Sequence, residues 1–212
     1  MQKISQVNLS DKYVVNMGVQ LGKGSTGSVY EGKDLQSEQT VAVKVIELAT
    51  IDNEVTHYLL EMEKKALMAI ESPYVLKGLK IWQDKKFCFM VSEHCNGGTL
   101  KQHIYKKGKL EEEESLDLIR KVLEGYQHLV NKKIVHRDLK PANIMLHDKS
   151  PKIIDFGYCE ISGYKKPSLE YNVGSPSYMA PESFDLNIYN EKTEIWAIGV
   201  ILFECVTGRT ID

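Results

Sequence analysis

The hydrophobic pattern of this sequence changes its period near residue 95, and that change limits what the chain can fold into. In residues 41–46, valines at alternate positions indicate a β-strand, because successive side chains of a strand point to opposite faces. After Asn96-Gly97-Gly98 the spacing becomes three and four, which predicts a helix with an apolar stripe formed by Leu116, Ile119, Leu123, Tyr126 and Val130. We therefore expect an α+β fold, with a strand-rich lobe, a helix-rich lobe and a ligand cleft between them.

One helix is expected within the strand-rich lobe. Its apolar stripe has spacings of four and three and consists of Val55, Leu59, Met62, Ala66 and Ala69. Glu63 lies beside this stripe, from where it could reach a neighbouring sheet. Ser72-Pro73 predicts the end of the helix, since the residue before a proline disfavours helical conformation. Strand-like segments follow at residues 76–82 and 87–93.

Composition limits the partners and the cellular location that we expect for this protein. The 212 residues carry a net charge of −2, so we expect neither a nucleic-acid partner nor attraction to anionic membranes. The four cysteines are scattered without a CxxC pair, which is typical of reduced thiols and predicts a cytoplasmic location. The longest apolar run, residues 195–206, is too short to span a bilayer and contains Glu204, so we expect a buried helix and no membrane segment.

A glycine-rich stretch at residues 21–29 reads Leu-Gly-Lys-Gly-Ser-Thr-Gly-Ser-Val. Glycines let backbone N–H groups approach phosphates, although a plain glycine-rich hairpin has the same composition. A dinucleotide-binding fold would need a helix directly after the glycines. Here a second strand follows at residues 29–32, which favours a loop folded over a nucleotide between two strands. Lys44, inside the next strand, needs an anion, and phosphates on one side with Glu63 on the other would supply it.

Residues 136–143, His-Arg-Asp-Leu-Lys-Pro-Ala-Asn, form the most specific motif. Pro141 discourages helix and predicts a rigid loop. Asp155 follows in Ile153-Ile154-Asp155-Phe156-Gly157. Two carboxylates and the Asn143 amide in one cleft suit a divalent metal that bridges phosphate oxygens, and a spare acid can orient a hydroxyl group and take its proton.

In their order and spacing these motifs, together with Ala180-Pro181-Glu182, resemble those of the eukaryotic protein kinases. The resemblance implies a bilobal fold over residues 13–212. Its first lobe, residues 13–93, would be a small antiparallel sheet with one main helix. The hinge would be residues 93–96, and residues 97–212 would form a mostly helical lobe that lacks its last helices.

The resemblance also implies ATP and Mg²⁺ as ligands and a role for each matching residue. Asp138 would accept the substrate proton, with Lys140 near the transferred phosphate, and Lys44 would bind phosphates and pair with Glu63. Asn143 and Asp155 would bind the metal ions. The glycine loop would cover the phosphates, the Glu93 carbonyl and Cys95 amide would bind adenine, and Ser92 would guard the rear pocket. The implied nucleotide site comprises Leu21, Gly22, Lys23, Gly24, Ser25, Gly27, Val29, Ala42, Lys44, Glu93, Cys95 and Met145.

Lys140, two residues after Asp138, is similar to the lysine of serine/threonine kinases, so the expected partner is a protein substrate with a serine or threonine. Residues 174–182, around GSPSYMAPE, resemble more closely the autophagy-initiating kinase group. Arg137 resembles the arginine of kinases that are controlled by phosphorylation. The usual threonine position is Tyr171, so control through Ser168 or Ser175, or without phosphorylation, is expected.

Two features depart from the family pattern. Glu194 stands where the family normally has an aspartate that braces the catalytic loop. The longer glutamate could hold the loop more loosely, but the favoured interpretation is that the exchange is tolerated. The sequence given stops at Asp212, before the helices that normally cover the second lobe. A partner chain or further C-terminal residues are expected to cover that surface. The alternatives to an active enzyme are an ATP-binding pseudokinase and an inactive fragment.

Overall fold

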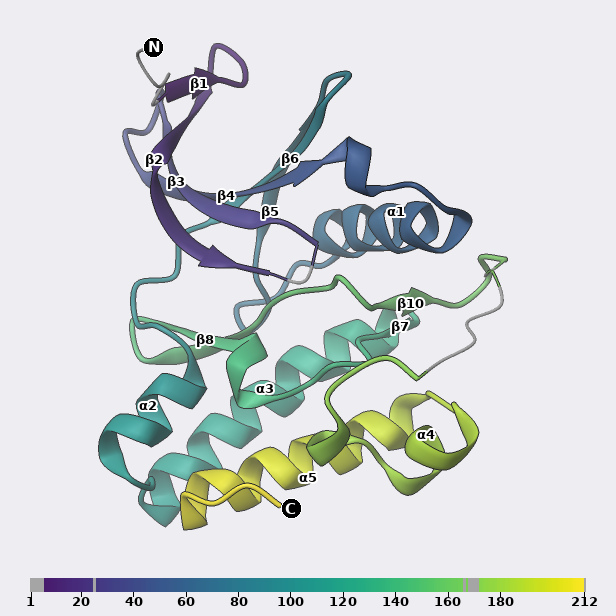
Figure 1. Ribbon diagram of the computed structural model, residues 1–212. Coiled ribbons are helices and arrows are strands. Elements are labelled where there is room, and N and C mark those ends of the chain that lie inside the picture. The colour runs from purple at the N-terminus through teal and green to yellow at the C-terminus, as the bar shows by residue number, and fades with distance from the viewer. Residues whose placement is uncertain (1–5, 25, 166, 168–171, 212) are drawn as a thin grey trace.

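The computed structural model describes residues 6–24, 26–165, 167 and 172–211. The chain forms two lobes, a curved sheet with one long helix and a mostly helical lobe below it (Figure 1). This bilobal α+β fold confirms the expected fold class. The strands are β1 (Gln6–Asn8), β2 (Tyr13–Lys23), β3 (Ser28–Asp34), β4 (Thr40–Glu47), β5 (Gly78–Gln83), β6 (Phe87–Glu93), β7 (Ile134–Val135), β8 (Ile144–His147), β9 (Ser150–Ile153) and β10 (Glu160–Ile161). The α-helices are α1 (Glu54–Ala69), α2 (Leu100–Lys107), α3 (Glu112–Asn131), α4 (Pro181–Leu186) and α5 (Glu191–Thr207).

The sheet of the first lobe is antiparallel in the order β1-β2-β3-β4-β6-β5. Strand β4 shows why its residues alternate. Val41, Val43 and Val45 are buried in an apolar cluster on one face of the sheet, while Ala42 and Lys44 line the cleft on the other. Strand β1 precedes residue 13, and pairs with β2 through Val7 opposite Val15.

Helix α1 begins with a capping box. The Asn53 side chain accepts a hydrogen bond from the Thr56 N–H at 2.9 Å, and Thr56 Oγ1 accepts one from the Asn53 N–H at 3.3 Å. The predicted stripe locates the helix, but the buried face is rotated from it. Leu60 and Leu67 pack against the sheet, whereas Ala69 is exposed. Glu63, beside the predicted stripe, is buried.

Helix α3 forms the centre of the second lobe, where it packs against α5 and β9. The predicted stripe for this helix is partly wrong, because Leu116 and Leu123 are 46% and 39% exposed. The buried face instead consists of Ser115, Leu118, Ile119, Val122, Gly125, Tyr126 and Leu129. Apolar residues occur on two faces of this helix, and packing against α5 and β9 selects one of them.

The apolar run at residues 195–206 lies in α5, and only one face of this helix is buried. Ala197, Ile198, Ile201 and Cys205 belong to the core of the second lobe. The expected buried helix is present on this face, but on the other face Ile195, Trp196 and Phe203 are 49%, 49% and 41% exposed. That a partner chain or further C-terminal residues cover this exposed face stays a prediction. Within the described ranges, no helix is long and apolar enough to cross a membrane.

Each lobe contains one of the two tryptophans. Trp82 lies in β5 and is partly buried, with its ring centroid 5.3 Å from that of Phe89. Trp196 lies on the exposed face of α5. The two indoles therefore have different surroundings.

Candidate active site

A cavity of about 450 Å³ lies between the lobes. This volume is within the range of small-molecule sites, roughly 300–1,000 Å³. The predicted nucleotide, metal and ion-pair residues that line it are Leu21, Gly22, Lys23, Gly24, Val29, Ala42, Lys44, Glu63, Glu93, Cys95, Asn143, Met145 and Asp155. Ser92 lines it as well, and its role in guarding the rear of the pocket stays a prediction. Ser25 lies outside the described residues.

Gly27 is not among the lining residues, and its place over the phosphates stays a prediction, but the structure gives a separate reason for a glycine here. A Cβ atom at this position would meet the carbonyl oxygen of Val45 well inside van der Waals contact, and it would lie 2.9 Å from Cγ1 of Ile46. The glycine therefore lets the end of the loop approach β4 closely.

At the hinge, the Glu93 side chain is already engaged. Its Oε1 accepts a hydrogen bond from the Lys77 N–H at 2.8 Å and forms an ion pair with Lys152 Nζ at 2.9 Å. The backbone, rather than the carboxylate, is therefore the part of Glu93 that can bind a nucleotide base. Burial raises the pKa of the neighbouring Cys95 thiol to about 11, so this side chain is uncharged at neutral pH.

The residues that follow the hinge are bound to the hairpin of β8 and β9. The Gly97 N–H donates to the Leu146 carbonyl at 2.8 Å, and the Leu146 N–H donates to the Gly98 carbonyl at 2.8 Å. Asn96 Nδ2 donates to Asp148 Oδ1 at 2.7 Å, and its own Oδ1 accepts the Asp148 N–H at 3.0 Å. The end of the hinge is therefore fixed to the second lobe.

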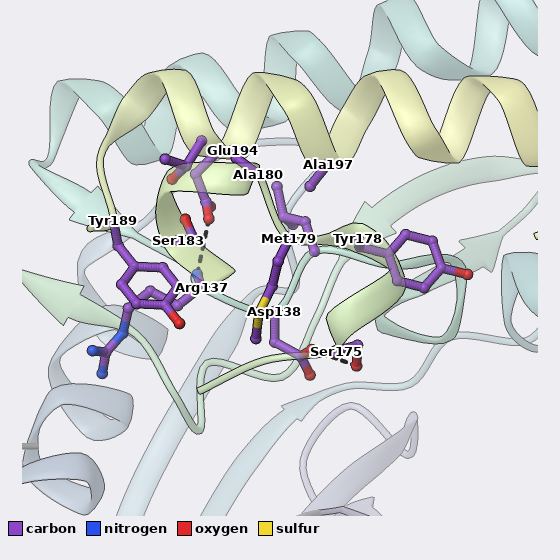
Figure 2. A pocket seen from close by; sticks show the side chains of 12 residues that line it. Arg137, Asp138, Ser175, Tyr178, Met179, Ala180, Ser183, Tyr189, Glu194 and Ala197 are labelled. Carbon is purple, nitrogen blue, oxygen red and sulfur yellow. Dashed lines mark hydrogen bonds between the residues drawn. The ribbon is translucent and has the colours of Figure 1, made fainter. Parts of the chain in front are cut away.

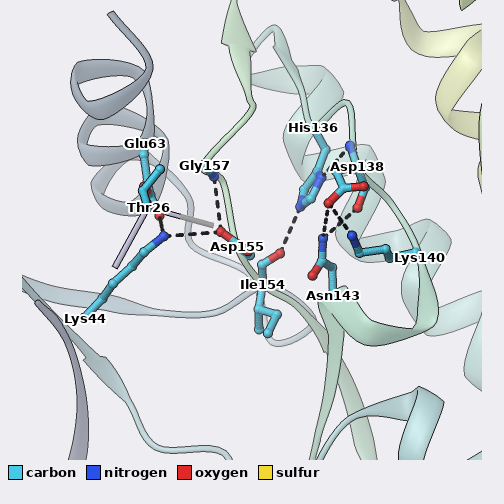
Figure 3. Close-up of polar contacts among 10 residues, drawn as sticks. All are labelled: Thr26, Lys44, Glu63, His136, Asp138, Lys140, Asn143, Ile154, Asp155 and Gly157. Carbon is cyan, nitrogen blue, oxygen red and sulfur yellow. Dashed lines mark hydrogen bonds and ion pairs between the residues drawn. The ribbon is translucent and has the colours of Figure 1, made fainter. Parts of the chain in front are cut away.

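Lys44 joins the two lobes (Figure 3). Its Nζ lies 2.5 Å from Glu63 Oε1 on α1 and 3.3 Å from Asp155 Oδ1 in the second lobe. The predicted Lys44–Glu63 pair is present, and Asp155 is a third member that the sequence did not predict. Asp155 has a positive φ of 62°, a conformation that residues other than glycine rarely adopt.

Burial and charge act in opposite directions on these three groups. Burial raises the pKa of Glu63, and the Lys44 ammonium and Thr26 hydroxyl oppose that rise. Burial by itself would lower the pKa of Lys44, but the Glu63 and Asp155 carboxylates outweigh it and raise the pKa. Burial also acts to raise the pKa of Asp155, yet Lys44 and the other donors lower it overall. A single cation thus faces two carboxylates, which suits a site that receives another cation.

The carboxylate of Asp138 is buried and held by three side chains. Oδ2 lies 2.7 Å from Lys140 Nζ and accepts a hydrogen bond from Asn143 Nδ2 at 2.9 Å. Oδ1 accepts one from Ser175 Oγ at 2.9 Å, and Ser175 in turn accepts from Lys140 Nζ at 2.8 Å. The structure thus brings Asp138, Lys140 and Asn143 together, as their spacing in the motif predicts.

The loop that carries Asp138 is braced by Glu194 of α5. This buried carboxylate accepts the N–H groups of His136 at 2.9 Å and Arg137 at 3.0 Å, and Figure 2 shows it directed at the backbone of Arg137. Both bonds agree with the favoured reading of Glu194 as a tolerated exchange, rather than with a looser brace. Gly174 packs closely against the same loop, because a Cβ atom at this position would overlap the Arg137 carbonyl oxygen.

His136 connects this loop to Asp155. Its Nε2 bonds the Ile154 carbonyl at 2.9 Å, and its Nδ1 accepts the Asp138 N–H at 3.3 Å. These roles define the tautomer with the proton on Nε2. The ring is fully buried, with its centroid 5.4 Å from that of Phe156. His136 therefore fixes the segments of both aspartates relative to each other.

The arginine expected to receive a regulatory phosphate is buried. The Arg137 side chain is 1% exposed, its Nε donates to the Tyr158 carbonyl at 2.5 Å, and its Nη1 lies 3.5 Å from Glu160. Of the proposed phosphorylation sites, Ser168 lies outside the described residues, as does Tyr171. A phosphate on Ser175 would lie against the Asp138 carboxylate, which argues against an activating role for that serine.

Asn143 and Asp155 can hold Mg²⁺ if phosphate oxygens complete the site. The described part of the chain has no group of three or more His, Cys, Asp or Glu side chains that could hold a metal by themselves. Mg²⁺ is usually bound by one or two carboxylates together with substrate phosphates, so two protein ligands fit it. Asn143 Nδ2 donates to Asp138, which makes the amide oxygen the atom that can bind a cation.

Sequence reasoning missed Thr26, Ser175 as a partner of Asp138, and the cavity residues Asn96 and Gln102. Thr26 Oγ1 donates to Glu63 Oε2 at 3.4 Å, and Gln102 lies in the wall of the cavity. Thr26 and Ser175 are each 37 positions from their partners. Their only sequence signal is that each adjoins a glycine motif.

Comparison with known proteins agrees with this geometry. Residues 15–211 match the family model described as protein kinase domain. The chain is 35% identical over 198 residues to serine/threonine-protein kinase ATG1b of Arabidopsis thaliana, an alignment that covers 92% of this chain and 28% of that protein. It is 37% identical over 194 residues to human hormonally up-regulated neu tumor-associated kinase, covering 89% and 27%. It is 31% identical over 207 residues to mitogen-activated protein kinase kinase 1 of Arabidopsis thaliana, covering 97% and 57%.

The chain therefore belongs to the protein kinase family, which confirms the resemblance drawn from its motifs. It spans about a quarter of the length of two of these relatives and 57% of the third.

Proposed function

We propose that this protein transfers the γ-phosphate of ATP to serine or threonine hydroxyl groups of protein substrates. The observation that carries the proposal is the arrangement of charged groups at the cleft. The Lys44–Glu63 pair and Asp155 line one cavity together with Asn143, and Asn143 bonds to the Asp138 carboxylate. Phosphoryl transfer depends mainly on positioning and charge stabilisation, and these groups provide both.

Each residue has a defined task in this proposal. Asp138, whose carboxylate is held by Lys140, Asn143 and Ser175, receives the proton of the substrate hydroxyl. Lys44 binds phosphate oxygens and Lys140 approaches the transferred group. Mg²⁺ held by Asn143 and Asp155 would neutralise charge on the phosphates.

The choice of serine or threonine is supported by Lys140 and by the printed names of the relatives. ATG1b is named a serine/threonine-protein kinase, and Lys140 occupies the position that is a lysine in kinases of this type. We assign residues 13–93 to the nucleotide lobe, 93–96 to the hinge and 97–212 to the substrate lobe. A cytoplasmic location is proposed from the four cysteines, all of which are unpaired thiols.

A phosphate-transfer assay on a generic basic protein tests the proposal. Labelled Mg-ATP is supplied to the wild-type chain, to Asp138→Ala and Asp155→Ala, and to Asp117→Ala on the exposed surface of α3 as a control. We expect transfer by the wild type and the control, and a loss of about 10²–10⁴-fold in Asp138→Ala, the range typical of a positioned base. Label on tyrosine rather than serine or threonine would contradict the substrate assignment.

The alternative is an ATP-binding protein without transferase activity. Thermal melting with and without Mg-ATP separates the two functions, since a ligand that binds the native state raises its stability. A shift in melting without label on any substrate would support the non-catalytic function. Asp138→Ala keeps Lys44 and Asp155, so its melting shift with Mg-ATP is expected to equal that of the wild type.

A further inference from the structure

The hinge is bound at both ends to the hairpin of β8 and β9. At its end, the Gly97 N–H and the Asn96 side chain are bonded to β8 and to the turn between the two strands. At its start, Lys152 of β9 places its Nζ 2.9 Å from Oε1 of Glu93. Figure 1 shows the chain passing from β6 to α2 beside β8. The backbone that is expected to bind a nucleotide base is therefore held between two contacts with one hairpin.

The carboxylate of Glu93 also binds the first lobe. Its Oε1 accepts the N–H of Lys77 at 2.8 Å, and the Glu93 N–H donates to the Lys77 carbonyl at 3.0 Å. The backbone of a residue can rotate only about φ and ψ. Because the N–H and the side chain of Glu93 are both engaged, these contacts restrict that rotation and so define the direction of the Glu93 carbonyl.

Lys152 is buried beside the cavity without lining it. It is 7% exposed and stands opposite Met145 in the hairpin, and Met145 is one of the cavity residues whereas Lys152 is not. A buried ammonium group is costly without an anion, and a buried ion pair is often no more stabilising than apolar residues of the same size. We therefore look for the effect of this pair in the geometry of the hinge rather than in the stability of the fold.

From these contacts we propose that Lys152 is a positioning residue, which directs the Glu93 carbonyl at the 6-amino group of an adenine base by holding the Glu93 side chain. The inference rests on the proposed use of ATP. A carbonyl oxygen only accepts hydrogen bonds, and the 6-amino group is a donor of adenine. Without the ammonium group, the Glu93 side chain, which is 22% exposed, can turn toward water, and the carbonyl then loses its direction. Lys152 thus sets the preference for adenine over a purine that lacks the amino group.

Isothermal titration calorimetry with adenosine and with purine riboside, the same nucleoside without the 6-amino group, tests this inference. The proteins are the wild type, Lys152→Met, Lys152→Arg, which keeps the positive charge, and Lys80→Met, which makes the same exchange at an exposed position of β5. We expect Lys152→Met to bind adenosine roughly three- to tenfold more weakly than the wild type, the worth of about one hydrogen bond, with unchanged binding of purine riboside. Lys152→Arg and Lys80→Met should keep the wild-type ratio of the two affinities.

A second variant approaches the pair from the other side. Glu93→Gln keeps an oxygen for the Lys77 N–H and the backbone carbonyl itself, but removes the charge that binds Lys152. We expect the same loss of adenosine binding as in Lys152→Met, and no further loss when the two exchanges are combined, because both remove one interaction. If Lys152→Met does not fold, as judged by circular dichroism, Glu93→Gln decides the question in the same way.

An unchanged ratio of affinities in the folded variants would overturn the inference, as would equal weakening of both nucleosides or a wild type that does not prefer adenosine. Phosphate transfer by a protein with an unchanged ratio would leave the proposed function standing alone. Failure of the wild type to bind either nucleoside would overturn the inference together with the proposed use of ATP. The expected loss of preference in a protein that transfers no phosphate would uphold the inference and contradict the transferase function alone.

Discussion

At the scale of single residues, the loop that carries Asp138 depends on Glu194. Its carboxylate comes from α5, some 57 positions after the loop, and accepts two adjacent buried N–H groups, those of His136 and Arg137. Arg137 has a positive φ of 68°, so the loop turns sharply where the carboxylate holds it. Such a conformation persists because its surroundings fix it.

Replacement of Glu194 by alanine should therefore destabilise the fold as well as the loop. Each buried N–H left without an acceptor costs about 1–3 kcal/mol, so with two such groups we expect the free energy of unfolding to fall by about 2–6 kcal/mol. Glu194→Asp should show a smaller loss, because its carboxylate is one methylene shorter. Urea unfolding measures both, with Glu191→Ala at the exposed start of α5 as the control. Equal losses in Glu194→Ala and Glu191→Ala would contradict the brace.

Because of these buried carboxylates, we also expect the proposed activity and the folded structure to be lost at different pH values in acid. Burial raises the pKa of Glu63 and of Glu194 above the ordinary value of 4.5, whereas the pKa of Asp155 lies below its ordinary 3.8. On acidification the two glutamates take up protons first, above pH 4.5. Lys44 then loses a charged partner, and the loop that carries Asp138 loses its charged acceptor.

Protonation of these two glutamates affects stability in the opposite direction from its effect on the site. A raised folded-state pKa means that the native state binds the proton more tightly than the unfolded chain, so these two groups do not favour unfolding as the pH falls through that window. The stability that Asp155 contributes is present above pH 3.8 and is lost as the pH falls through its lower folded-state pKa. We expect the proposed phosphate transfer to be lost at a higher pH than the circular dichroism signal. Coincident loss of the two signals would contradict this order.

At the scale of elements, the loop between β2 and β3 depends on its last glycine. Gly27→Ala would place a methyl group against the Val45 carbonyl and 2.9 Å from Ile46 Cγ1. Overpacking of this kind costs about 1–3 kcal/mol, and we expect the melting temperature of the nucleotide-free protein to fall accordingly. Gly22→Ala is the matched control, because a Cβ at Gly22 has no neighbour within 4 Å. Equal melting temperatures for the two variants would contradict the close approach.

The helices also show which features of the fold can be predicted from the sequence and which cannot. The periods of α1 and α3 predict both helices, yet a period does not state which apolar face is buried when two are present. In α3, Leu116 and Leu123 fit the period as well as Leu118 and Val122 do, and contact with α5 and β9 buries the second pair. Motifs predict Asp138, Lys140 and Asn143 together because all three lie in one short loop. Thr26 and Ser175 escape prediction because the folded chain brings them to partners 37 positions away.

At the scale of the whole molecule, the four cysteines are all buried and unpaired. Burial raises the pKa of Cys95 to about 11 and of Cys205 to about 12, and it raises the pKa of Cys88 and Cys159 as well. The thiolate is the reactive form, so little of it is present at neutral pH. Iodoacetamide should label the native protein slowly at pH 7 and label all four thiols quickly in urea, as mass spectrometry can count. Rapid labelling of Cys95 in the native state would show that the hinge is open.

The position of the two tryptophans has a practical consequence, because the molecule contains one optical reporter in each lobe. Trp82 lies beside Phe89 in the sheet, and Trp196 is 49% exposed on α5. An indole in water emits at longer wavelengths than a shielded one, so the two emissions should differ. A Trp82→Phe variant would leave fluorescence from the second lobe alone, and Trp196→Phe from the first. Matching melting curves from the two variants would mean that the lobes unfold as one cooperative unit, and separate curves would mean that each lobe melts by itself.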